Sequence, residues 1–127
     1  MSDCKQRICV VEDNADNRLL LQALLGDDFD LVEYEAGPEA VAGVAADPPD
    51  LVLLDVSLPG MDGLEVLAKL RAVPELAGLA IIALTAHAMA GDRERLLAAG
   101  FDEYVSKPIV DERVLLAAIA HCLGRSG

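Results

Sequence analysis

The fold of this chain is decided by an apolar run that ends on an acid, Leu51-Val52-Leu53-Leu54-Asp55. Four consecutive apolar residues without polar alternation indicate a strand that is covered on both faces, as strands of a parallel sheet are. Pro59 and Gly60 follow soon afterwards and are typical of a turn. We therefore expect Asp55 to stand at the carboxyl end of a buried strand.

Comparable short runs recur along the chain. They cover residues 8–11, 31–34, 80–84 and 104–105. Longer segments with helical spacing separate these runs, so strand and helix alternate five times. This alternation predicts an α/β fold of the doubly wound kind, in which helices cover both faces of a parallel five-stranded sheet as a three-layer sandwich.

The helices are expected to follow Asn14 as far as Gly26, to run from Pro38 to Ala46 and from Asp92 to Gly100, and to begin near Asp62 and Asp111. The residues expected to be buried are Leu20, Ala23 and Leu24 in the first, Leu64, Val66, Leu67 and Leu70 in the third, and Val114, Leu115, Ala118 and Ile119 in the fifth.

Length and composition limit the possible functions. At 127 residues the chain fits one domain over 1–127, and 10 basic against 22 acidic residues give a net charge of -12. Such a charge disfavours nucleic acid and anionic membranes as partners. The three cysteines form no metal or disulfide pattern, and no apolar run reaches the ~18 residues that span a bilayer. We expect a cytoplasmic protein whose partners are proteins or cations.

Ligands of such sheets bind beyond the carboxyl ends of the strands. The residues there are Glu12 and Asp13, Asp55, Thr85, and Lys107. Three carboxylates about 4 Å apart repel by roughly 4 kcal/mol per pair at an effective dielectric of ~20, so a cation is expected among them. Oxygen ligands select a hard ion, and Mg²⁺ is the expected one.

A carboxylate can attack phosphorus and form an acyl phosphate, provided that the charge of the phosphoryl oxygens is neutralised. Asp55 is the expected acceptor, because it ends the most apolar strand. Glu12 and Asp13 would hold the metal, while Lys107 and Thr85 would contact the phosphoryl oxygens.

Four stretches together resemble the receiver domain of two-component response regulators. They are Val11-Glu12-Asp13-Asn14, Leu54-Asp55-Val56-Ser57-Leu58-Pro59-Gly60-Met61-Asp62-Gly63, Leu84-Thr85-Ala86 and Tyr104-Val105-Ser106-Lys107-Pro108. Each alone is a weak signal, but four in order at the ends of the expected strands are specific. The resemblance covers nearly the whole chain.

The resemblance implies a flavodoxin-like sheet of order 2-1-3-4-5. It implies that Mg²⁺, for which Mn²⁺ or Ca²⁺ can substitute, is bound by Glu12, Asp13, Asp55 and the backbone carbonyl of Ser57. It implies that Asp55 receives its phosphoryl group from a sensor histidine kinase or a histidine phosphotransfer protein.

In the family, Thr85 then moves toward the phosphoryl group and Tyr104 swings inward. The face made by the fourth helix, fifth strand and fifth helix changes for a downstream effector protein. Ser57 and His87 occupy positions that influence the lifetime of the acyl phosphate.

Each residue also has a plainer interpretation. Glu12 and Asp13 favour the positive end of a helix, Asp55 suits a turn, and Thr85, Tyr104 and Lys107 are ordinary strand or loop residues when taken singly.

Other functions stay open as well. The chain is either a free-standing single-domain regulator, which an initiating Met1 close to the first strand favours, or a receiver excised from a hybrid kinase or longer regulator. A phosphatase would need a second carboxylate where Ser57 stands, so no turnover enzyme is expected. A docking module without phosphorylation is the third alternative.

Overall fold

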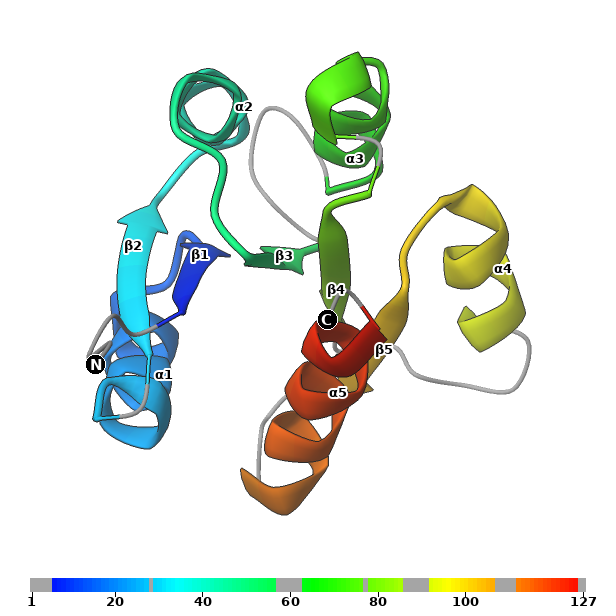
Figure 1. Cartoon of the computed structure of the whole chain (residues 1–127). Coiled ribbons are helices and arrows are strands. Elements are labelled where there is room, and N and C mark those ends of the chain that lie inside the picture. Colours follow the sequence, from blue (N-terminus) through cyan, green and yellow to red (C-terminus); the bar gives the residue numbers. More distant parts are fainter. Residues whose placement is uncertain are drawn as a thin grey trace.

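Strands and helices alternate along the whole chain (Figure 1). The computed structural model describes residues 6–27, 29–56, 63–76, 78–85, 92–106 and 112–125, and for residues 92, 93, 112, 124 and 125 only the backbone. The elements are β1 (Arg7–Val11), α1 (Ala15–Leu25), β2 (Asp30–Tyr34), α2 (Gly37–Ala46), β3 (Leu51–Asp55), α3 (Gly63–Arg71), the short 3₁₀ helix η1 (Pro74–Leu76), β4 (Ala80–Thr85), α4 (Asp92–Ala99), β5 (Glu103–Ser106) and α5 (Glu112–Arg125). The expected strands are confirmed, with bounds that differ by no more than one residue at either end.

The five strands form one parallel sheet in the order β2-β1-β3-β4-β5. The chain moves from β1 outward to β2, crosses back over β1 to β3, and then continues outward to β5. The winding direction therefore reverses between β1 and β3, which confirms the doubly wound fold and the predicted strand order. This reversal is where ligands bind in sheets of this kind.

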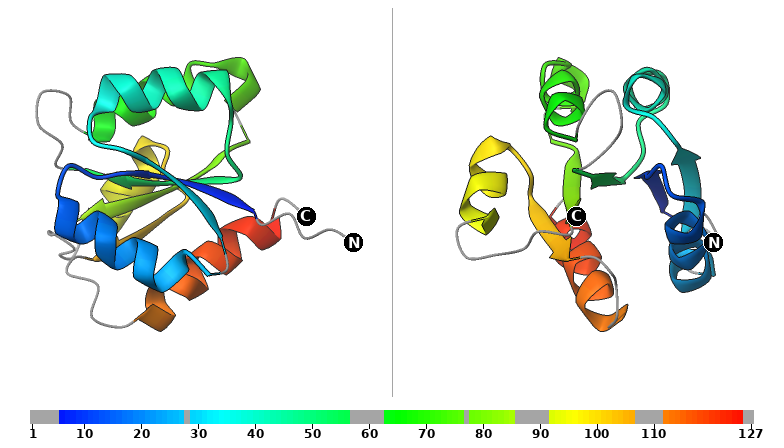
Figure 2. Two further views of the ribbon diagram at one scale, coloured as in Figure 1. Left: turned by 90° about the vertical axis from the view of Figure 1, so that its left-hand side faces the viewer. Right: turned by 180° about the vertical axis from the view of Figure 1, so that it is seen from behind.

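Both faces of the sheet are apolar because successive strand residues point to opposite sides. Val52 and Leu54 join one buried cluster with side chains from α2, α3 and α4, whereas Leu51 and Leu53 join a second cluster with side chains from α1 and α5. Figure 2 shows the same division, with α2 and α3 on one side of the sheet and α1 and α5 on the other. The three-layer arrangement is confirmed.

The buried faces of two helices differ from the expectation. In α1 the structure buries Leu21 and Leu25, whereas Leu20 and Ala23 are exposed and Leu24 is partly buried. The run Leu19-Leu20-Leu21 places apolar residues around much of the helix, so spacing alone does not identify the inner row. In α5 Val114 is 54% exposed, while Leu115, Ala118 and Ile119 are buried as predicted. In α3 Val66, Leu67 and Leu70 are buried and Leu64 is partly so.

The helix ends agree with the sequence signals where they are described. The Asn14 side chain accepts hydrogen bonds from the backbone N–H groups of Asp16 (2.8 Å) and Asn17 (3.1 Å), which satisfies two donors at the start of α1. Gly26 ends α1, Pro38 lies in the first turn of α2, and Gly100 follows α4 with a φ of 126°, which favours a residue without a Cβ. Asp62 and Asp111 lie outside the described residues.

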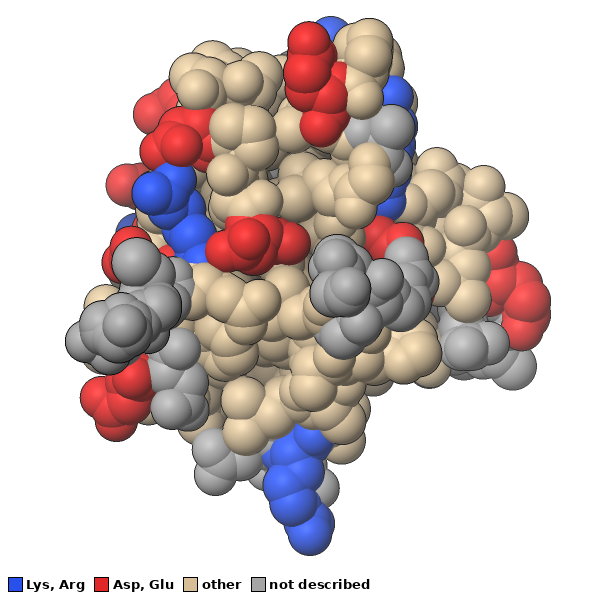
Figure 3. All heavy atoms as spheres, in the orientation of Figure 1, with Lys and Arg blue, Asp and Glu red and all other residues tan. Residues whose placement is uncertain are grey.

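The surface is acidic. On the face in Figure 3, acidic side chains (red) lie at the left, the top, the centre and the right edge, and fewer basic side chains (blue) lie at the upper left, the upper right and the bottom. None of the described helices has the length and apolar character needed to cross a bilayer.

Candidate functional site

Three carboxylates meet where the winding of the sheet reverses. Val11 pairs with Leu54 across the parallel ladder, so the residues that follow and end these strands, Glu12 and Asp55, lie side by side. Glu12 is 1% exposed and Asp55 is 2% exposed, whereas the neighbouring Asp13 is exposed to solvent. One carboxylate oxygen from each of the three lies within 4.8 Å of the others. The structure brings together the three acidic side chains that the sequence predicts.

The backbone of Glu12 is held on two sides. Its N–H donates to the carbonyl of Tyr34 at the end of β2 (3.0 Å), and its own carbonyl accepts a hydrogen bond from Nη1 of Arg18 in α1 (2.8 Å). Its carboxylate Oε2 also accepts from the backbone N–H of Asn14 (3.3 Å). The turn between β1 and α1 is thereby fixed by β2, by the helix and by its own cap.

Arg18 is the residue that sequence reasoning missed. The available signal was its isolation, because it is the one basic residue between Arg7 and Lys69 in a stretch rich in acids.

The other side of the site is built from β3 and β4. Asp55 pairs with Leu84, and the N–H of Val56 donates to the carbonyl of Leu84 (3.0 Å), so Thr85 lies one residue further along the neighbouring strand. Thr85 is buried, at 5% exposure. The backbone that follows Asp55 is tied to the start of α3, where the N–H of Gly63 donates to the carbonyl of Val56 (2.9 Å).

Tyr104 lies on β5 and pairs with Ala83. Its side chain is partly buried and packs against the cluster that α2, α3 and α4 cover. Ser57, His87 and Lys107 lie outside the described residues, so the roles expected for them stay predictions.

The three carboxylates fit a hard divalent cation. At 4.8 Å and an effective dielectric of ~20, each pair of ionised carboxylates repels by roughly 3 kcal/mol. The donor set consists of oxygens alone, which suits Mg²⁺ or Ca²⁺ better than metals that prefer nitrogen or sulfur. The exposed Asp13 keeps the cluster open to water on one side, as an ion that retains several of its own waters requires.

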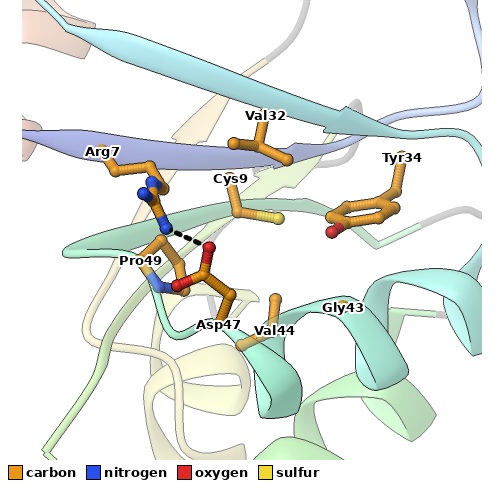
Figure 4. A pocket seen from close by; sticks show the side chains of 8 residues that line it. All are labelled: Arg7, Cys9, Val32, Tyr34, Gly43, Val44, Asp47 and Pro49. Carbon is orange, nitrogen blue, oxygen red and sulfur yellow. Dashed lines mark hydrogen bonds and ion pairs between the residues drawn. The ribbon is translucent and has the colours of Figure 1, made fainter.

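A separate hollow lies between α2 and the strands β1 and β2 (Figure 4). Its volume is about 30 Å³, enough for one or two water molecules, and an ion pair between Arg7 and Asp47 (2.6 Å) lies at its lining. Burial raises the pKa of the Cys9 thiol beside it to about 12, so this thiol is protonated and unreactive at neutral pH. The hollow includes none of the three clustered carboxylates.

Comparison with known proteins gives a consistent result. Residues 8–120 match the model of the response regulator receiver domain. The chain is 39% identical over 103 residues to the polar-differentiation response regulator DivK of Brucella ovis, which covers 80% of this chain and 84% of DivK. It is 41% identical over 108 residues to the signal transduction histidine-protein kinase BarA of Escherichia coli, which covers 84% of this chain but 12% of the kinase. The chain thus spans about an eighth of the length of that kinase.

The fold is also shared with solved structures. The receiver domain of sensor histidine kinase PA1611 from Pseudomonas aeruginosa superposes with a TM-score of 0.86 at 33% identity, over 95% of this chain and 99% of that one. That structure holds a magnesium ion in its active site cleft. The family match over most of the chain, the sheet order and the carboxylate cluster lead to one conclusion: this chain belongs to the family of response regulator receiver domains.

Proposed function

We propose that this chain is a phosphorylation switch in which Asp55 accepts a phosphoryl group from a histidine kinase or a histidine phosphotransfer protein. The observation that carries the proposal is the contrast within the carboxylate cluster. Two acids, Glu12 and Asp55, are almost fully buried, yet they lie within 4.8 Å of an exposed third acid, Asp13. Burying charged groups so close together is unfavourable, which supports a site kept for ligand chemistry rather than for stability.

Asp55 is the proposed nucleophile because it ends the central strand next to the switch point. One of its oxygens attacks the phosphorus of the donor while the phosphorus–nitrogen bond to the donor histidine breaks, and the imidazole leaves. Glu12, Asp13 and Asp55, together with the carbonyl of Ser57, would hold Mg²⁺, or Mn²⁺ or Ca²⁺ in its place, and the bound ion would supply positive charge against the phosphoryl oxygens. Lys107 is proposed to contact the same oxygens.

The signal is proposed to leave through α4, β5 and α5. A phosphoryl group adds a charge of about -1.5 to -2 at Asp55, which gives the hydroxyl of Thr85 a new acceptor. Thr85 and Tyr104 lie on adjacent strands, β4 and β5. Movement of the hydroxyl toward the phosphoryl group leaves space behind it into which the aromatic ring turns, and the outer face is then altered for an effector protein.

The chain is proposed to modify only itself. An aspartate-based phosphatase needs a general acid two residues after its nucleophile, and Ser57 stands at that position. Ser57 and His87 are instead proposed to set how fast water hydrolyses the acyl phosphate. The relatives differ in domain organisation: the chain matches most of the length of DivK but only a small part of BarA. We propose a cytoplasmic, single-domain regulator, with a receiver excised from a hybrid kinase as the alternative.

The proposal is tested by intact mass measurement. Wild type, Asp55→Asn and the exposed control Asp27→Asn are each incubated with Mg²⁺ and acetyl phosphate. We expect one added phosphoryl group on wild type and on Asp27→Asn, none on Asp55→Asn, and none on any variant when a chelator replaces Mg²⁺. An unmodified wild type contradicts the switch and favours a docking module, whereas a modified Asp55→Asn contradicts the site.

The output step is tested by NMR on the same samples. Phosphorylation of wild type should shift backbone resonances in α4, β5 and α5. Thr85→Val keeps the shape of the side chain but removes the hydroxyl, so we expect it to be phosphorylated with much smaller shifts at Tyr104. Full-sized shifts in Thr85→Val contradict a role for this hydroxyl in the switch.

A further inference from the structure

Arg18 contacts the backbone beside the carboxylate cluster and bridges the ends of β1 and β2. Its side chain is 15% exposed. Nη1 donates to the backbone carbonyl of Glu12 (2.8 Å), while Nε lies 3.7 Å from a carboxylate oxygen of Glu33 and Nη2 lies 4.0 Å from one of Glu35. The guanidinium therefore joins the turn after β1 to the acidic end of β2.

Arg18 is an isolated cation in an acidic part of the sequence. Between Arg7 and Lys69 the sequence holds one cation, Arg18, among many acids. Arg18 follows the cap residue Asn14 by one helical turn, so α1 carries it over the ends of β1 and β2. Without it, the carboxylates of Glu33 and Glu35 would lose the guanidinium that lies within 4.0 Å of both. The end of β2 would also lose its link through this guanidinium to the carbonyl of Glu12.

We infer that Arg18 is a positioning residue for the metal site: it holds the main chain of Glu12 so that the carboxylates of Glu12, Asp13 and Asp55 are arranged for Mg²⁺ before the ion arrives. The inference rests on the proposed function, because it assigns a role toward the same magnesium site. Groups that hold metal ligands in place typically contribute about 10- to 100-fold to metal affinity.

The direction in which Mg²⁺ affinity changes when Arg18 is removed distinguishes a positioning role from an effect of its charge alone. Arg18 is a cation near the site, so if charge alone mattered, its removal would strengthen Mg²⁺ binding by making the surroundings more negative. If Arg18 acts by holding the Glu12 carbonyl, its removal weakens Mg²⁺ binding despite the added negative charge. The two accounts predict opposite changes in one measured quantity.

The test is isothermal titration of Mg²⁺ into wild type, Arg18→Met, Arg18→Lys and the matched control Arg71→Met. Arg71 is also a partly buried arginine that donates to backbone carbonyls, those of Leu79 (2.6 Å) and Gly100 (2.8 Å). Its contacts are with the segments that enter β4 and β5, at the opposite end of the sheet from the carboxylates. Circular dichroism and urea unfolding confirm that each variant is folded at the titration temperature.

We expect Arg18→Met to bind Mg²⁺ about tenfold more weakly than wild type, and Arg71→Met to bind it with unchanged affinity although it is less stable. Arg18→Lys keeps the charge and one possible donor to Glu12, so an intermediate affinity is expected. It also serves as the test if Arg18→Met does not fold.

An affinity for Arg18→Met equal to or tighter than that of wild type overturns the inference, as does equal weakening in Arg71→Met. If Arg18→Lys replaces Arg18→Met, wild-type affinity in the lysine variant overturns it. A wild type that binds no Mg²⁺ overturns the proposed function and this inference together. Normal Mg²⁺ binding and phosphorylation in wild type with no effect of Arg18→Met overturns the inference alone.

Discussion

Gly63 is the position where one added methyl group should damage the site most. It begins α3 directly against the backbone of Asp55, the proposed phosphoryl acceptor, and of Val56. A Cβ placed on Gly63 would lie 2.5 Å from the carbonyl oxygen of Asp55 and 2.6 Å from the Cα of Val56. Both are backbone atoms, one at the end of β3 and one in the residue after it, so no side-chain rotation can relieve the contact. To reach even 3.0 Å the two segments must separate by about 0.5 Å.

Such overpacking typically costs about 1–3 kcal/mol, and the hydrogen bond from the N–H of Gly63 to the carbonyl of Val56 (2.9 Å) is strained at the same time. The matched control is Gly78→Ala, because a Cβ on Gly78 meets no atom within 4 Å. In that exposed turn the added methyl group should change stability little, and it restricts the unfolded chain. We therefore expect Gly63→Ala to be less stable than Gly78→Ala by at least about 1 kcal/mol.

The measurement is urea unfolding followed by circular dichroism, with the free energy of unfolding compared between the two variants at equal m-value. The rate of phosphorylation by acetyl phosphate is measured on the same samples under conditions where both are folded. We expect a slower reaction for Gly63→Ala, because separation of α3 from β3 moves the Asp55 carboxylate relative to those of Glu12 and Asp13. Equal stability and equal rates in the two variants would refute the reasoning.

Three further outcomes are expected. Mg²⁺ at about 100 times its Kd should raise the free energy of unfolding of wild type by about 2.7 kcal/mol. Asp13→Asn should lose most of this stabilisation in thermal melts. An equal stabilisation of that variant contradicts the metal site. Arg71→Met should lower the free energy of unfolding, measured in urea, by about 2–4 kcal/mol. The reason is that the carbonyls of Leu79 and Gly100 and the carboxylate of Asp102 (2.9 Å) lose the Arg71 donor. A loss below about 0.5 kcal/mol contradicts this expectation. Because burial raises the pKa of the Cys9 thiol from 9.0 to about 12, the unfolded chain releases this proton first, and stability falls as pH rises from about 9 toward about 12. From pH 8 to pH 10, urea titrations should show wild type losing about 1 kcal/mol more than Cys9→Val, and equal losses contradict the assignment.

The strands and the acids at their ends could be predicted because both signals are local. A continuous apolar run such as Leu51 to Leu54 is stable only when both of its faces are covered, so the run itself specifies a buried parallel strand. The carboxyl ends of parallel strands share one edge, so acids that follow two such runs lie along the same edge, and they meet when the two strands are neighbours, as β1 and β3 are. For the same reason the cluster of Glu12, Asp13 and Asp55 was predictable in advance of any coordinates. The order of the strands came from the family resemblance, since periodicity carries no information on which strands are neighbours.

Two features were decided only by the tertiary structure: the buried face of α1 and the contacts of Arg18. Both depend on how a helix is rotated against the sheet and on which strand ends lie beside it. The leucines of α1 suit several orientations of the helix, and packing against β1 and α5 selected Leu21 and Leu25 over Leu20 and Ala23. In the sequence Arg18 stands out only as an isolated basic residue, and nothing local shows what it contacts. It donates a hydrogen bond to the Glu12 carbonyl, and the return of the chain through β2 brings Glu33 and Glu35 within 4.0 Å of the same guanidinium. The sequence alone therefore determined the strands and the acids that make the site, and the folded chain determined what holds those acids in place.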